Sequence, residues 1–150
     1  MKSRIDKTRI LEACIQKQDE LIDNFTQREA EMNKDTFSQN ESASQSEDRR
    51  AGKYELLKVI GDELAFAQEE LAYLNRLDIT KENTVVAPGA VVVTEQFVFF
   101  IGVSSEKVEV DGDTVFGIST KAPIYANMRG LEKGSKFQFN ETHYIIEDVY

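Results

Sequence analysis

Apolar residues recur at alternating spacings of three and four along two stretches in the first half of the chain. The first stretch runs from about Ser3 to Lys34, and the second follows a polar, serine-rich break that begins at Phe37. This spacing puts apolar side chains on one face of a helix, and two such helices joined by a break form a coiled-coil hairpin. The predicted seam of the first helix, interrupted by a glutamine and an arginine, is Leu11, Cys14, Gln18, Leu21, Phe25, Arg28 and Met32. The seam of the second, without interruption, is Leu57, Ile60, Leu64, Ala67, Leu71 and Leu74.

Beyond Asp78 the pattern changes to short apolar runs separated by glycine and proline, which is typical of strands and tight turns. Asp111-Gly112-Asp113 is a hairpin turn signal, and Thr120–Gly130 combines an early proline with a closing glycine, as a helix of about two turns does. The strands are expected at 84–94, 97–103, 107–110, 114–118, 136–140 and 143–150. We therefore predict an α+β protein, with an N-terminal antiparallel coiled-coil hairpin over 1–78 and a small antiparallel β-sheet domain with one short helix over 79–150.

The formal charge of −9 comes from 27 acidic and 18 basic side chains. Divided at Asp78, it is −5 before and −4 after, so it is shared between the predicted halves. Phosphate binding draws on clustered Lys and Arg, so this balance argues against duplex DNA or an anionic membrane as a partner. No apolar run approaches a membrane span and the first residues lack the apolar core of a signal peptide, which favours a cytoplasmic location.

The sequence lacks the constellations of common enzymes, so no catalytic residue and no enzymatic activity of the chain's own is predicted. With one cysteine and one histidine, a four-ligand Cys/His metal site is not available. His143 is expected to face solvent at the start of a strand, and Asp111-Gly112-Asp113 lacks the later ligands of an EF-hand, which favours a plain turn. Cys14 lies on the apolar stripe, where a small buried side chain is favoured over a reactive thiol.

Carboxylates gather near the predicted hairpin tip, and they are the candidate chemistry of this chain. Two carboxylates on a rigid arm could help bind Mg²⁺, which takes one or two protein carboxylates together with water and phosphate oxygens. A solvated acidic loop is the alternative, and the neighbouring arginines 49 and 50 could neutralise the acidic pair. The candidates are Asp35, Glu41, Glu47 and Asp48.

Two segments of the second half resemble the Gre transcript-cleavage factors of bacterial RNA polymerase. Residues 117–134, GISTKAPIYANMRGLEKG, are similar to the family's strand, Ser-Pro-Ile variant, short helix and Gly-Lys ending. Residues 144–149, YIIEDV, are similar to its closing Tyr-x-Ile-x-x-Val pattern. The resemblance implies that the C-terminal domain is FKBP-like and docks on RNA polymerase, while the coiled coil enters the secondary channel. The docking residues that it implies are Ala122, Pro123, Ile124 and Gly130.

The family's tip carries an Asp and, three residues later, a Glu that hold the second catalytic Mg²⁺ while the polymerase hydrolyses backtracked RNA. Anchoring the family pattern on Tyr54 puts Glu47 at the Asp position and Arg50 at the Glu position. A guanidinium cannot ligate Mg²⁺, so the second carboxylate would come from Asp48 or Glu41, or be absent.

The resemblance thus implies an accessory factor that is a monomer, holds no intrinsic metal or cofactor, and shares Mg²⁺ with the polymerase active site. It would reach the RNA 3′ end only indirectly, and it would either stimulate cleavage or regulate the polymerase without it.

Two other functions fit the same residues. An interaction or scaffold protein is suggested by the stronger second seam, whose surplus apolar surface could pair with another coil. A prolyl isomerase is suggested by the FKBP-like fold alone, and fold does not carry function. The aromatic residues of the second half are placed for core packing rather than for a proline pocket; they are Phe97, Phe99, Phe100 and Phe116.

Overall fold

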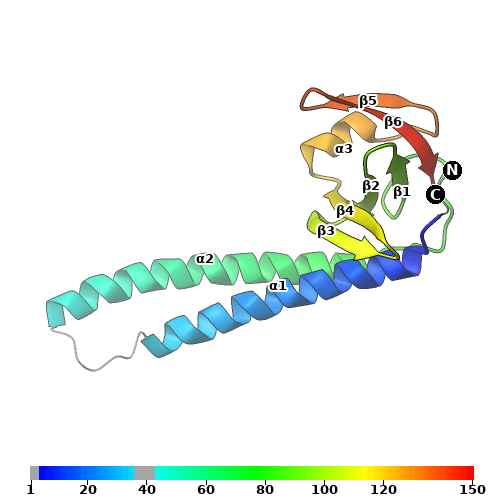
Figure 1. Ribbon diagram of the computed structural model, residues 1–150. Helices are drawn as coiled ribbons and strands as arrows, with labels where there is room; N and C mark the ends of the chain where they lie inside the picture. Colours follow the sequence, from blue (N-terminus) through cyan, green and yellow to red (C-terminus); the bar gives the residue numbers. More distant parts are fainter. Residues whose placement is uncertain (1–3, 36–42) are drawn as a thin grey trace. The chain divides into compact units, whose positions relative to one another are not determined.

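The computed structural model describes residues 4–35 and 43–150, with side chains described for 4–34 and 52–150 (Figure 1). Two long helices precede six strands and one short helix, which confirms the predicted α+β class. None of the helices in the described ranges is long and apolar enough to cross a membrane. In chain order the elements are α1 (Lys7–Asp35), α2 (Ala43–Arg76), β1 (Val91–Thr94), β2 (Val98–Gly102), β3 (Ser105–Val110), β4 (Asp113–Ser119), α3 (Pro123–Met128), β5 (Lys136–Phe139) and β6 (Thr142–Val149).

The chain divides into two compact units. One combines Met1–Lys17 with Ala72–Tyr150, and the other is Gln18–Leu71. The first unit therefore contains the sheet, the beginning of α1 and the end of α2. The sequence-based boundary between domains at 1–78 and 79–150 stays a prediction.

The six strands form one sheet in the order β3-β4-β2-β1-β6-β5. Four of its pairings are antiparallel, whereas β2 and β4 run parallel, with Val98 beside Val115 and Gly102 beside Ser119. The prediction of a wholly antiparallel sheet is wrong at this pair. The parallel pairing arises because β3 lies at the edge of the sheet, and β4 lies between β3 and β2 and runs in the same direction as β2.

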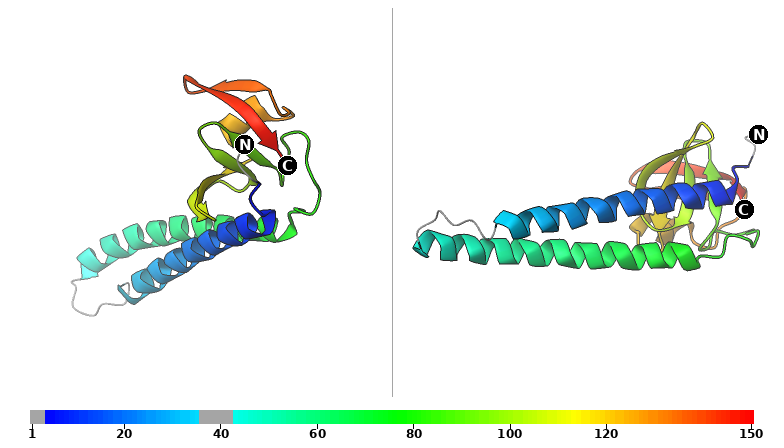
Figure 2. Two further views of the ribbon diagram at one scale, coloured as in Figure 1. Left: turned by 45° about the vertical axis from the view of Figure 1, so that its right-hand side comes forward. Right: turned by 90° about the horizontal axis from the view of Figure 1, so that it is seen from below.

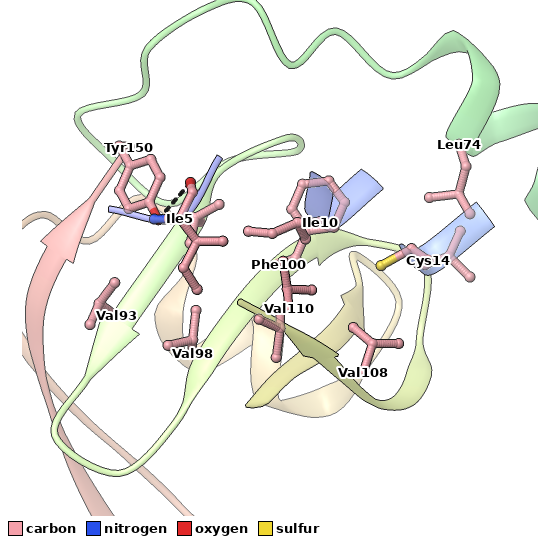
Figure 3. Packing of buried hydrophobic residues seen from close by; sticks show 13 residues of the cluster. Ile5, Ile10, Cys14, Leu74, Val93, Val98, Phe100, Val108, Val110 and Tyr150 are labelled. Carbon is pink, nitrogen blue, oxygen red and sulfur yellow. Dashed lines mark hydrogen bonds between the residues drawn. The ribbon is translucent and has the colours of Figure 1, made fainter. Parts of the chain in front are cut away.

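One face of the sheet is covered by the beginning of α1 and the end of α2 (Figure 3). Ile10 and Leu74 are buried there against Phe100, together with other side chains of the central strands. The backbone N–H of Ile5 donates to the Tyr150 hydroxyl oxygen at 2.7 Å, and that hydroxyl donates to the Ile5 carbonyl oxygen at 3.2 Å. The helix ends are therefore part of the core of this unit.

The other face is covered by α3, through Ile124, Tyr125 and Met128. Because both faces are covered, every residue of β1 and β2 is buried. This accounts for the continuous apolar runs of these strands, since a strand covered on both faces need not alternate with polar residues.

The turns follow the sequence signals closely. Asp111 and Gly112 have φ of 52° and 84° and connect β3 to β4, as the hairpin signal predicts. The run 84–94 forms a strand only from Val91, because the chain turns at Gly89, whose φ is 87°. A Cβ at Gly89 would lie 2.7 Å from the Asp78 carbonyl oxygen, so this turn requires glycine.

The 18–71 unit consists of two antiparallel helical segments that lie side by side in both figures (Figures 1 and 2). All six predicted seam positions of α2 are buried or half-buried, which confirms that seam. On α1 the predicted seam positions Leu21 and Arg28 are exposed. The next residues along the chain, Ile22 and Glu29, are half-buried instead. A straight helix of 3.6 residues per turn drifts from a strict seven-residue repeat, which explains the shift by one residue.

Candidate functional site

The predicted tip carboxylates cannot be placed by the structure. Glu41 lies outside the described residues, and the side chains of Asp35, Glu47 and Asp48 also lie outside them, although their backbones belong to α1 and α2. In the described part of the chain, no group of three or more His, Cys, Asp and Glu side chains could hold a metal ion. The Mg²⁺ hypothesis therefore stays a prediction.

The predicted docking segment lies at α3. Ala122 is the residue before the helix, with φ −70° and ψ 140°, and Pro123 opens the first turn, as the sequence predicts. Ala122, the N-cap residue, makes no side-chain capping hydrogen bond.

The four residues predicted to dock on a partner differ in exposure. Pro123 and Gly130 lie at the surface, Ala122 is half-buried, and Ile124 is buried in the core beneath the helix. Gly130 has φ of 75°, and its N–H donates to the Val86 carbonyl oxygen at 3.0 Å. A partner could therefore contact Pro123 and Gly130 directly, whereas Ile124 holds the segment in place.

His143 and Cys14 adopt the structural roles predicted for them. His143 is exposed on β6, and Cys14 is buried in the core between α1 and the sheet. Burial raises the pKa of the Cys14 thiol to about 11, because a thiolate would lose its hydration there. At neutral pH Cys14 is therefore a protonated core residue and not a nucleophile.

The aromatic residues of the sheet pack among themselves. The ring of Phe97 meets Phe116 edge-on at a centroid distance of 5.2 Å, and Phe99 contacts both. Phe100 is fully buried on the opposite face, against α1 and α2. Core packing, which the sequence favoured over a proline pocket, therefore holds for Phe99 and Phe100, whereas Phe116 is half-buried and Phe97 is 39% exposed.

A small cleft carries basic residues that are already engaged. The Arg4 guanidinium donates to both carboxylate oxygens of Asp148 at 3.0 and 3.2 Å and to Glu82 at 2.6 Å. The Lys7 ammonium donates to the Lys81 carbonyl oxygen at 3.1 Å, and its burial lowers its pKa. An anion would have to displace these partners, so the cleft is not a ready anion site.

The seam of the 18–71 unit contains a buried polar contact. Gln18 is 4% exposed, and its side-chain Nε2 donates to the Ala67 carbonyl oxygen on the facing helix at 2.9 Å. Ala67 leaves room for this long side chain, since its own is a single methyl group. A buried hydrogen bond from a side-chain amide fixes the register of two helices, because a shifted pairing would leave the amide without a partner.

A groove runs along one side of this helix pair, and we call it the hairpin groove. Its apolar walls are formed by Phe25 and Met32 from α1 and by Leu56, Val59 and Ile60 from α2. Ile60 is buried at the seam, whereas Leu56 and Val59 are 51% and 52% exposed. The sequence analysis did not predict this surface, although the spacing of three between Leu56 and Val59 places both side chains on one helix face.

The charge of the chain is concentrated on the hairpin unit. Residues 18–71 hold 14 acidic and 6 basic side chains, a formal charge of −8, which leaves −1 of the total −9 for the rest. The even division expected from the sequence depended on placing the boundary at Asp78. The hairpin groove therefore lies in the acidic part of the protein.

Comparison with protein-family models, with curated proteins and with solved structures gives no match.

Proposed function

We propose that this chain is a regulator that binds bacterial RNA polymerase in the manner of the Gre factors. The observation that carries the proposal is the combination of an antiparallel helix pair with a six-stranded α+β unit in which the 117–134 segment forms β4, α3 and the turn at Gly130. The resemblance of this segment and of β6 to the family supports it. In this proposal the sheet unit is FKBP-like and docks on the polymerase, and the helix pair enters the secondary channel.

Binding to the polymerase is the first test. Tagged full-length protein should retain core RNA polymerase on a resin, and Pro123→Glu should weaken this retention, because Pro123 is exposed on the docking segment and glutamate is tolerated in a first helical turn. Lys136→Glu on the edge strand β5 is the matched control and should bind like the parent protein. Absence of binding by the parent protein would end the proposal.

Transcript cleavage is the second test. A stalled, backtracked elongation complex should be incubated with the parent protein and with Glu47→Ala, Asp48→Ala and Glu41→Ala. Faster cleavage that is lost in these variants indicates Mg²⁺ ligation at the tip. Binding without cleavage selects a regulator that acts by occupying the channel.

An interaction or scaffold protein is the second candidate, and a specific observation favours it. Large apolar side chains among the described residues of α2 are about half exposed, and they include Leu56, Val59 and Phe66. Such surface favours association with a further helix. Sedimentation at several concentrations distinguishes a homotypic coil from a monomer.

A further inference from the structure

A second stripe on α2, separate from its seam, is formed by three exposed apolar residues. Leu56, Val59 and Phe66 follow one another at spacings of three and seven, with Glu63 at the intervening position. This is the spacing of a coiled-coil face, and it continues over about 16 Å of helix. The exposed fractions of the three apolar side chains are 51%, 52% and 55%.

The stripe borders the hairpin groove, so the surface offered to a partner includes both helices. Leu56 and Val59 line the groove opposite Phe25 and Met32, which are half-buried. A third helix lying in the groove would contact the apolar stripe of α2, which has the spacing of coiled-coil positions a and d, and the side of α1. This arrangement extends a two-helix coiled coil to three helices.

Carboxylates lie within the stripe, across the groove from it and on its outer side. Glu63 and Glu31 lie at the groove, where Arg28 is the one cation among the described lining residues. On the outer side, Glu55 and Asp62 alternate with Val59 and Phe66 at helical spacings of three and four. The charged positions of an incoming helix would therefore face mainly negative side chains.

The same charge argues against a second copy of the chain as the occupant. Two hairpin units would bring formal charges of −8 together, and like charges across an interface are unfavourable. The surface favours a partner with apolar side chains for the stripe and positive charges for the carboxylates. A helix whose apolar stripe is bordered by Lys and Arg offers both.

We propose that the hairpin groove binds a basic amphipathic helix of a partner protein. The proposal goes beyond the polymerase hypothesis and does not depend on it, because it rests on the side chains of residues 25–32 and 55–66 and not on the α3 segment or the tip.

Fluorescence anisotropy with labelled synthetic peptides tests it on the full chain. The probe is a helix of about three heptads with leucine at positions a and d and lysine at e and g. One control peptide carries glutamate at e and g, and another has the lysine peptide's composition in scrambled order. The lysine helix should bind at least about tenfold more tightly than either control, and its affinity should fall with added salt.

Protein variants locate the site. The double variant Leu56→Gln/Val59→Gln should weaken binding at least about tenfold, since two side chains lose the burial that the peptide would give them. Ile145→Gln, on β6, removes an apolar side chain of comparable exposure, 39%, and should leave binding unchanged. Glu31→Gln/Glu63→Gln should weaken binding and reduce its dependence on salt.

Four results would overturn the proposal. They are no binding of the lysine helix, equal binding of the scrambled lysine peptide, equal binding of the glutamate helix, and self-association of the protein that Val59→Gln abolishes. The last result would identify a second copy as the occupant. Polymerase retention by the same variants is measured in parallel, so failure here and failure of the polymerase hypothesis are read separately.

Discussion

Replacing Gly117 by alanine should be among the most damaging single-methyl changes in this protein. Gly117 lies on β4 opposite Ser105, at a register irregularity between β3 and β4. A Cβ at this position would lie 2.3 Å from the Val103 carbonyl oxygen and 2.5 Å from the Ser105 hydroxyl oxygen. The first of these atoms belongs to the backbone between β2 and β3, so the segment that leads into β3 must move away.

The size of the effect follows from that displacement. Moving the backbone disturbs one or two ladder hydrogen bonds, each worth about 0.5–1.5 kcal/mol, and adds overpacking strain of about 1–3 kcal/mol. We expect Gly117→Ala to lower the free energy of unfolding by about 2–4 kcal/mol. For a chain of this length that corresponds to a decrease in Tm of roughly 5–15 °C.

Urea denaturation and calorimetry of the full chain provide the measurement. Gly112→Ala is the matched control, because its Cβ would meet nothing within 4 Å and only its φ of 84° opposes alanine. It should be destabilised by about 1 kcal/mol.

A second control isolates the contact with the serine. Ser105 Oγ is buried and has no hydrogen-bond partner in the described part of the chain, so Ser105→Ala alone should be tolerated. In Gly117→Ala/Ser105→Ala part of the loss should be restored, while the clash with Val103 remains. A Gly117→Ala protein as stable as the parent would refute the steric reasoning.

Three further changes test contacts on both units. Gln18→Ala should lower the free energy of unfolding by about 2 kcal/mol in urea denaturation, because it leaves a cavity at the seam, whereas Gln18→Leu should lose less; equal losses would contradict the packing argument. Tyr150→Phe should lose about 1–3 kcal/mol in the same assay, because the buried Ile5 N–H keeps no acceptor; an unchanged midpoint would show that this N–H finds another partner. Cys14 should react very slowly with a thiol reagent at pH 8 in native protein and quickly in denaturant. Because folding raises the pKa of the Cys14 thiol to about 11, the thiol of the unfolded chain ionises at lower pH than that of the folded chain. The free energy of unfolding should therefore fall from about pH 9 upward, and it should fall less in Cys14→Ala. Rapid labelling of the native protein would place the thiol at the surface.

Local sequence patterns predicted the elements of this fold, but they did not predict which strands pair or which helix faces pack together. The seam from Leu57 to Leu74, the turn at Asp111-Gly112 and the helix opened by Pro123 each depend on a few neighbouring residues, and each was predicted correctly. The parallel pairing of β2 with β4 depends on where β3 goes, which alternation within a strand does not record. The exposure of Leu21 and the partial burial of Ile22 likewise depend on the accumulated twist of α1 against α2.

The candidate site was predicted less completely. The tip carboxylates remain predictions because the described side chains do not include them, and the exposure of Pro123 beside buried Ile124 required the packing of α3. The hairpin groove was missed for a different reason. A seam search keeps the best apolar stripe of a helix, so a second stripe through Val59 and Phe66 is set aside as ordinary surface.

The double covering of the central strands has a consequence for synthesis. Ile5 and Ile10 leave the ribosome long before Tyr150, which belongs to the same core and follows Ile5 by 145 residues. Folding of this layer must wait until Tyr150 has been made, and such long-range closure is slow. The 18–71 helices need only each other and can pair while the strands are still being made, so early binding of a partner would meet the helices first.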